Sequence, residues 1–169
     1  MAFVPLPVQK EADEKLHAEQ HAGFRLMDEM LQANDKEKTP RADIEAFFAL
    51  VERVAQNILD APGDPKFQRL KTSSKGYAPV KNVRMGERVM DYMGFRDRVE
   101  NLEHWNVLRT EGDWQEGLRR RAELVKKQYD KRKDAEEHEV RGATAKAEAD
   151  KRHKDELLAR IHEERKERK

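Results

Sequence analysis

Apolar residues recur at helical spacing in two stretches of the first third of the chain. In residues 13–33 they fall on one stripe, which predicts an amphipathic helix. Thr39-Pro40 should start a second helix, because threonine can cap free amides and proline at the first helical position loses no hydrogen bond. This second helix keeps the i, i+3, i+4 rhythm and is the predicted core helix, with an apolar side formed by Ile44, Phe47, Phe48, Val51, Ala55, Ile58 and Leu59.

Turn residues interrupt the pattern after the core helix. Asp60-Ala61-Pro62-Gly63 ends the helix. The run Lys66–Thr72 is expected to be a short strand, and Ser73–Gly76 a turn. The stretch Tyr77–Val83 predicts a second short strand, which Pro79 confines to a sheet edge or a strand end.

A further helix is predicted after this stretch. Asn82 is expected to cap it, and Gly94 to take the left-handed position that stops it. Its inward-facing residues are Val89, Met90 and Met93.

The last apolar cluster of this region contains Leu102, Trp105, Val107 and Leu108. A large aromatic residue near a domain end is more often a lid on the core than an anchor for a ligand. We therefore interpret Trp105 as such a lid.

Residues 111–169 have a different character and predict a long charged helix. Opposite charges repeatedly stand four residues apart in the order that favours a helix, and each pair contributes roughly a few tenths of a kcal/mol. Between Lys131 and Lys154, alanines replace the larger apolar residues of a coiled-coil seam, so no self-associating coiled coil is expected. A small terminal patch that could touch a partner is formed by Leu157, Leu158 and Ile161.

Composition limits the partners and the compartment. Of the 169 residues 41% are charged, but 35 basic and 34 acidic residues give a formal net charge of +1, so nucleic acid is an unlikely partner. The absence of cysteine fits a reducing compartment. No run approaches the ~20 apolar residues of a membrane span. We expect a cytoplasmic protein that does not bind membranes.

No catalytic arrangement is recognisable, so an enzyme is not expected. The glycines form no phosphate-binding loop, and the serines lie in one turn without an organised histidine. His17 and His21 are four residues apart, but they lack a third metal ligand. Neither a metal nor another cofactor is predicted.

The stretch from Asn57 to Phe95 combines several features in a fixed order. An Asn precedes two helix-terminal apolar residues, a Pro, a Lys-aromatic-basic run and an apolar-Met-Gly-Phe ending. This order resembles the PUB domain, the peptide-docking module of peptide:N-glycanase, over roughly residues 42 to 110. Two positions depart from that family: Met85-Gly86 replaces a usual Gly-Ala, and Ser73 replaces an Asn on the pocket rim.

The resemblance implies a mainly α fold with a small antiparallel β-sheet, a PUB-like α+β domain followed by the long charged C-terminal helix. The expected organisation is an extended N-terminal tail (1–12), an amphipathic helix and linker (13–38), the PUB-like domain (39–110) and the charged helical extension (111–169).

The resemblance also implies a peptide-binding site formed by Asn57, Lys66, Phe67, Arg69, Lys71 and Ser73. By this resemblance, Asn57 binds the main chain of the peptide, and Phe67 forms the bottom of a pocket that accepts an aromatic side chain. The basic residues attract the acidic tail. The alternative is that Asn57 caps its own helix, Phe67 belongs to the core and the lysines are simply solvated.

Two functions remain open at this point. By the resemblance, the protein is a non-enzymatic adaptor that docks an acidic, aromatic C-terminal peptide such as the tail of the valosin-containing AAA ATPase, in the ubiquitin-proteasome pathway. The alternative is a structural constituent of a large assembly, such as a ciliary or flagellar doublet microtubule or a ribosome-like particle. In that case the PUB-like domain would pack against neighbouring proteins of the assembly. Its partner would be the tubulin-based scaffold or the particle.

Overall fold

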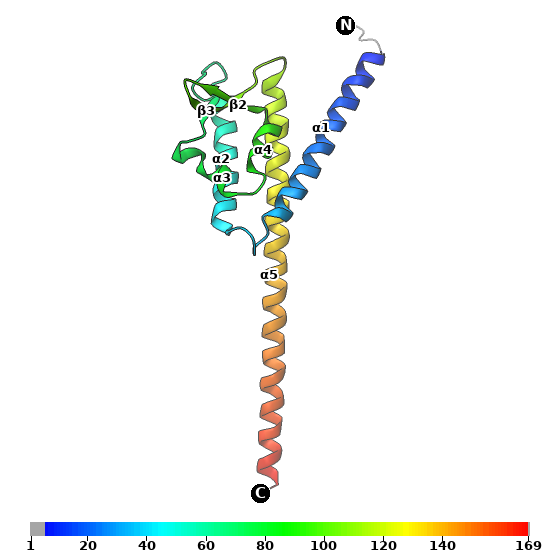
Figure 1. Ribbon diagram of the computed structural model, residues 1–169. Helices are drawn as coiled ribbons and strands as arrows, with labels where there is room; N and C mark the ends of the chain where they lie inside the picture. Colours follow the sequence, from blue (N-terminus) through cyan, green and yellow to red (C-terminus); the bar gives the residue numbers. More distant parts are fainter. Residues whose placement is uncertain (1–5, 169) are drawn as a thin grey trace. The chain divides into compact units, whose positions relative to one another are not determined.

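The computed structural model describes residues 6–168, with side chains from residue 8 on. The chain divides into two compact units, residues 1–129 and 130–169. Its described elements, in chain order, are α1 (Leu6–Ala33), α2 (Arg41–Asp60), β1 (Arg69–Lys71), the 3-10 helix η1 (Lys75–Tyr77), α3 (Ala78–Asn82), α4 (Gly86–Met93), β2 (Phe95–Glu100), β3 (Glu103–Leu108) and α5 (Trp114–Glu167). The predicted fold class is confirmed: the chain is mainly helical, with a small antiparallel sheet and a long C-terminal helix (Figure 1).

The amphipathic helix predicted for residues 13–33 is confirmed, but it begins earlier, at Leu6. The extended tail predicted for residues 1–12 is therefore wrong from Leu6 onward; residues 1–5 lie outside the described residues. The physical reason is that Pro7 lies in the first helical turn. There the missing N–H of proline costs no hydrogen bond.

The short linker between α1 and α2 is built around the side chain of Asn34, which is buried. Its Nδ2 donates to the backbone oxygens of Met30 and Arg84, both at 2.8 Å. Its Oδ1 accepts from the Thr39 hydroxyl at 2.9 Å and from the backbone N–H of Arg84 at 2.8 Å. One amide thus joins the end of α1, the start of α2 and the loop before α4.

This network corrects the capping role predicted for Thr39. Pro40 takes the N-cap position of α2, without a side-chain hydrogen bond to the helix. The hydroxyl of Thr39 is turned to Asn34 instead. A tertiary partner has replaced the local one, because Thr39 is buried and its hydroxyl needs a partner in the interior.

The three strands form an antiparallel sheet in the order β1-β3-β2. The strand predicted for Lys66–Thr72 is confirmed in its central part by β1. The hairpin of β2 and β3 was not predicted. Its two-residue turn has positive φ at Asn101 (51°) and at Leu102 (65°), which is the requirement of a tight hairpin turn. Leu102, expected in the last apolar cluster, is therefore at the turn tip and 97% exposed.

The second strand predicted for Tyr77–Val83 is wrong, because this stretch forms η1 and α3. Pro79 lies at the start of α3, where proline is as well tolerated as at a sheet edge. Asn82 ends α3 and does not cap the next helix. The helix α4 instead starts after Met85, which has a left-handed conformation with φ of 63°.

The end of α4 follows the prediction. Gly94 takes the left-handed position with φ of 109°, and its N–H bonds back to the helix. The predicted inward-facing residues Val89, Met90 and Met93 are all buried.

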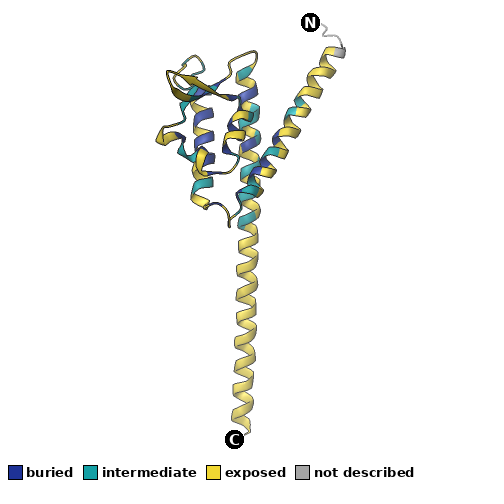
Figure 2. Ribbon diagram, viewed as in Figure 1, coloured by how far each residue is buried: buried dark blue, intermediate teal, exposed yellow. Residues whose placement is uncertain are grey.

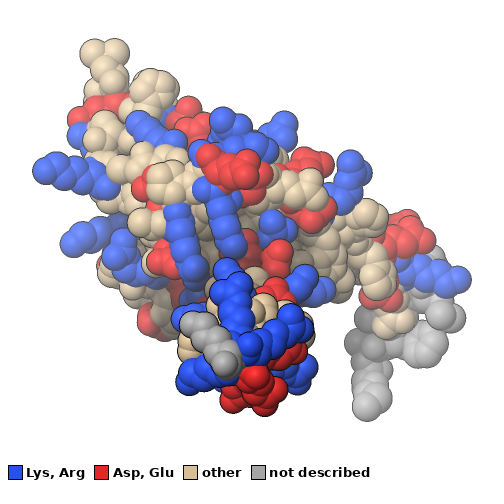
Figure 3. All heavy atoms as spheres, turned by 90° about the horizontal axis from the view of Figure 1, so that it is seen from below, with Lys and Arg blue, Asp and Glu red and all other residues tan. Residues whose placement is uncertain are grey.

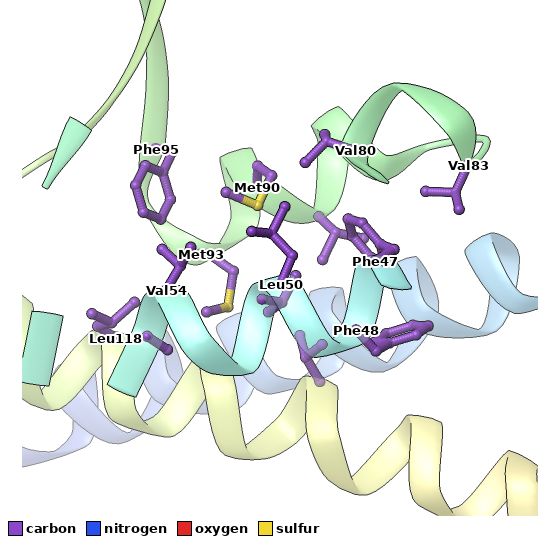
Figure 4. Packing of buried hydrophobic residues seen from close by; sticks show 14 of the residues in the cluster. Phe47, Phe48, Leu50, Val54, Val80, Val83, Met90, Met93, Phe95 and Leu118 are labelled. Atoms are coloured by element: carbon purple, nitrogen blue, oxygen red, sulfur yellow. The ribbon is translucent and has the colours of Figure 1, made fainter. Parts of the chain in front are cut away.

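The core of the first unit lies between α2 and the elements packed around it. Figure 4 shows side chains of α2, α3, α4, β2 and α5 pointing toward one another in this interior. The buried cluster extends beyond residues 39–110, the range predicted for the PUB-like domain. It also contains Met27 and Met30 of α1 and Leu118 and Val125 of α5.

The part of α5 in the second unit has no buried residue among residues 130–168 (Figure 2). It contains an ion pair four residues apart, Arg132 Nε to Glu136 Oε1 at 3.2 Å. The long charged helix predicted for this region is therefore confirmed. No helix in residues 6–168 is long and apolar enough to span a membrane.

In the first unit, α1, α4 and α5 meet at the side chain of Tyr92. Glu19 of α1 forms ion pairs with Arg120 (3.5 Å) and Arg121 (3.7 Å) of α5. Burial, together with the charge of Glu19, raises the pKa of Tyr92 to about 12, although Arg121 and Arg120 act in the opposite direction. The junction therefore favours the neutral phenol.

We expect Asn34→Ala to lower the free energy of unfolding by about 1 to 3 kcal/mol, because it leaves the partly buried N–H and C=O of Arg84 and the buried Thr39 hydroxyl without their partner. Urea unfolding of the full chain measures this. The control Gln32→Ala removes only an exposed hydrogen bond to Asp28 and should change stability by less than about 0.5 kcal/mol. Equal effects of the two substitutions would contradict the role of Asn34.

The close approach of α4 to α3 gives a second prediction. A Cβ on Gly86 would lie 2.3 Å from the backbone oxygen of Val80 and 2.8 Å from Val83 Cγ2. Gly86→Ala should therefore destabilise the protein by about 1 to 3 kcal/mol through overpacking. Gly63→Ala is the matched control, since nothing lies within 4 Å of its Cβ position. Thermal unfolding that shows no difference between the two variants would contradict this close packing.

The pKa of Tyr92 predicts an alkaline loss of stability. Since the folded-state pKa, about 12, lies above the ordinary value of 10.0, the folded chain holds this proton more tightly than the unfolded chain. The free energy of unfolding should fall as the pH rises from 10 toward 12. In Tyr92→Phe this fall should be smaller, as measured by urea unfolding across that range. An unchanged slope would mean that other groups cause it.

Candidate peptide-binding site

The predicted site residue Asn57 lies in the last turn of α2. Its backbone oxygen accepts the N–H of Ala61 at 3.2 Å, which closes the helix. Its side chain is exposed and makes no hydrogen bond with any residue that the structure describes. The side chain of Asn57 therefore does not cap its own helix and keeps both its donor and its acceptor for another molecule.

The loop after α2 holds Lys66 and Phe67 in a defined conformation. Asp64 organises it, because its Oδ1 accepts the backbone N–H of Lys66 at 3.0 Å and its backbone oxygen accepts that of Phe67 at 3.3 Å. Gln68 Nε2 donates to the oxygen of Pro62 at 2.7 Å across the loop. Phe67 is half-buried and packs on the core, whereas Lys66 is exposed.

Arg69 and Lys71 lie on the face of the sheet that points away from the core. Phe95, Asn106 and Leu108 are buried on the inner face. Because side chains alternate along a strand, the residues between them face outward. Arg69 is paired with Val107 and Lys71 with Trp105 in the sheet, so both cations share this outer face.

The two cations already have partners on this face. Arg69 is bonded to Glu100 and Lys71 to Glu103, each at 2.5 Å. The Arg69 guanidinium lies 4.2 Å from the centroid of the Trp105 ring, and Lys71 Nζ lies 5.9 Å from it. The prediction that Trp105 is a lid on the core is therefore wrong, because strand alternation turns its ring outward.

Ser73 lies in the exposed turn after β1. The neighbouring Ser74 donates from its hydroxyl to the oxygen of Lys71 at 2.7 Å, which closes the turn. The structure thus places Asn57 in the last turn of α2, and Lys66 and Phe67 in the loop that follows it. It groups Arg69 and Lys71 separately, around Trp105.

A pocket on the inner side of the sheet was not predicted. Its volume is about 390 Å³, and it is lined by Thr72, Tyr77, Lys81, Glu87, Asp91, Phe95, Asp97, His104 and Asn106. Burial raises the pKa of Tyr77, as do Glu87 and Asp97, while the hydrogen bond from Asn106 Nδ2 (3.1 Å) has the opposite effect. The sequence offered no signal for this pocket, because it depends on a hairpin that was not predicted and on a helix predicted as a strand.

Among the residues that the structure describes, no group of three or more His, Cys, Asp or Glu side chains could hold a metal ion. His17 and His21 are both exposed on α1.

No family model matches the sequence, and no curated protein matches it.

Proposed function

We propose that this chain is a non-enzymatic protein-interaction module that docks an acidic, aromatic-containing C-terminal peptide at the end of α2. The observation that carries the proposal is the combination found there. Phe67 offers a half-buried aromatic surface, and the exposed side chains of Asn57 and Lys66 have no partner among the described residues. This combination provides an apolar floor, a group that can bond to main-chain amides and a steering cation.

The chemistry of such a ligand follows from these three groups. A peptide ring gains from desolvation on Phe67, a peptide N–H or C=O can pair with the Asn57 amide, and a carboxylate is attracted by Lys66. Arg69 and Lys71 add positive charge on the adjoining strand, although Glu100 and Glu103 partly neutralise them. The resemblance to PUB domains points to the same ligand class, of which the tail of the valosin-containing AAA ATPase is one example.

A second function is favoured by the region after Tyr129. This helix buries no residue in the part that the structure describes, and it presents the exposed patch Leu157, Leu158 and Ile161. Acidic and basic residues are interspersed along this helix, as they are over the surface that is visible in Figure 3. In this alternative the protein is a structural constituent of a cytoplasmic or ciliary assembly, and the helix lies along its neighbours.

The first function is tested by calorimetric titration of the full chain with an acidic, aromatic C-terminal peptide such as the ATPase tail. A short peptide in a shallow site should bind with a Kd on the order of micromolar. Asn57→Ala should weaken binding by about 1 to 3 kcal/mol, since it leaves peptide groups unpaired. Lys66→Glu should act mainly on the association rate and its salt dependence.

The matched control is Gln56→Ala, one residue earlier on α2. Gln56 donates to Asp60 at 2.7 Å on the exposed surface, so its loss should leave peptide affinity unchanged. Phe67→Ala is unsuitable as the main test, because it also removes contacts with the core. If the folded wild-type chain does not bind millimolar peptide, the docking function is wrong.

A further inference from the structure

The outer face of the sheet has a regular arrangement of side chains. The order β1-β3-β2 and the strand register place outward-facing residues in rows across the three strands. Each of two successive rows has an apolar residue on the central strand and a cation on either side. The first row is Arg69, Val107 and Arg96, and the second is Lys71, Trp105 and Arg98.

Two of these four cations have no partner. Arg96 and Arg98 on β2 are exposed and form no ion pair or hydrogen bond with any residue in the described range. Arg69 and Lys71 on β1 are paired with Glu100 and Glu103. Four cations stand against two carboxylates, so the face is positive, and the excess charge lies along β2.

The environment of Trp105 bears on which class of acidic ligand, a nucleic acid or a protein, this face can bind. Proteins that bind single-stranded nucleic acid stack bases on open aromatic rings. Here the Arg69 guanidinium lies over the ring at 4.2 Å and occupies one of its faces. The arrangement therefore favours a protein ligand that brings its own apolar residues.

The spacing of the rows fits a helix. Adjacent strands are about 4.8 Å apart, so the backbones of β1 and β2 are roughly 10 Å apart, close to the diameter of an α-helix. Successive rows are about 6.8 Å apart along β3, and side chains three or four residues apart on a helix are separated by about 6 Å. A helix with one apolar stripe and acidic flanks thus complements both the apolar centre and the basic margins.

We infer that the outer face of the sheet, formed by Arg69, Lys71, Arg96, Arg98, Trp105 and Val107, docks an acidic amphipathic helix of a protein partner. The apolar stripe of that helix packs on Val107 and on the part of the Trp105 ring that Arg69 leaves exposed. Its carboxylates pair with Arg96 and Arg98, which have no partner within the chain. This surface shares Arg69 and Lys71 with the proposed peptide site but does not include Asn57, Lys66 or Phe67, and neither site needs the other to be occupied.

The test uses the full chain and a synthetic helical peptide of about 16 residues, or roughly four turns, with a leucine stripe flanked by glutamates. Binding is followed by NMR, through the amide signals of β2 and β3. We expect saturable shifts at Arg96, Arg98 and Trp105, weakened by salt because the partner charges are exposed. A peptide with lysine for glutamate and one with alanine for leucine should both fail to bind.

Substitutions locate the surface. The double substitution Arg96→Glu and Arg98→Glu should lower the affinity by about tenfold or more. The control Arg53→Glu and Arg88→Glu makes the same charge change at exposed arginines of α2 and α4 and should have little effect. Equal losses in both variants would overturn the inference, because they would show a non-specific charge effect. Absence of shifts in the wild-type chain at millimolar peptide would also overturn it.

Two further measurements separate this inference from other possibilities. Tighter binding of an oligo-uridine than of the acidic peptide, with shifts at the same amides, would make the face a nucleic-acid surface and overturn the inference. Asn57→Ala should leave binding of the helical peptide unchanged. The sheet face can therefore be confirmed even if the tail peptide does not bind at Asn57, and the reverse also holds.

Discussion

The fold of the first unit depends on the four hydrogen bonds made by the Asn34 side chain. They connect the end of α1, the start of α2 and the loop before α4, three segments that have no continuous secondary structure between them. Every donor and acceptor of this buried amide is used, so the network is specific as well as stabilising. It fixes where α4 begins, and α4 in turn fixes the close contact of Gly86 with Val80.

The sheet divides the first unit into two chemically different sides. Its inner face contributes Phe95 and Leu108 to the core, while its outer face carries cations around Trp105. A three-stranded sheet of this size has little stability of its own, so its position depends on the helices that cover the inner face. The charges of the outer face are partly or fully exposed to solvent, so they contribute little to the stability of the fold.

The predicted site residues lie in two places. Asn57, Lys66 and Phe67 come from one continuous stretch, the last turn of α2 and the loop after it. Arg69 and Lys71 follow that stretch in the chain, but strand alternation turns both toward Trp105, a residue more than 30 positions away. That contact requires the pairing of β1 with β3, which sequence periodicity does not report.

The sequence by itself determined the helices α1, α2 and α5, the Gly94 stop and the mixed charge of the C-terminal region, because these depend on periodicity and on local backbone preference. For residues that are compatible with two local conformations or two hydrogen-bond partners, only the tertiary structure decided between the two. Pro79 suits a helix start as well as a sheet edge, and packing of α3 against α2 selected the helix. Thr39 could have capped α2, but burial beside Asn34 gave its hydroxyl another partner. In both cases local preference was too weak to choose, and long-range packing made the choice.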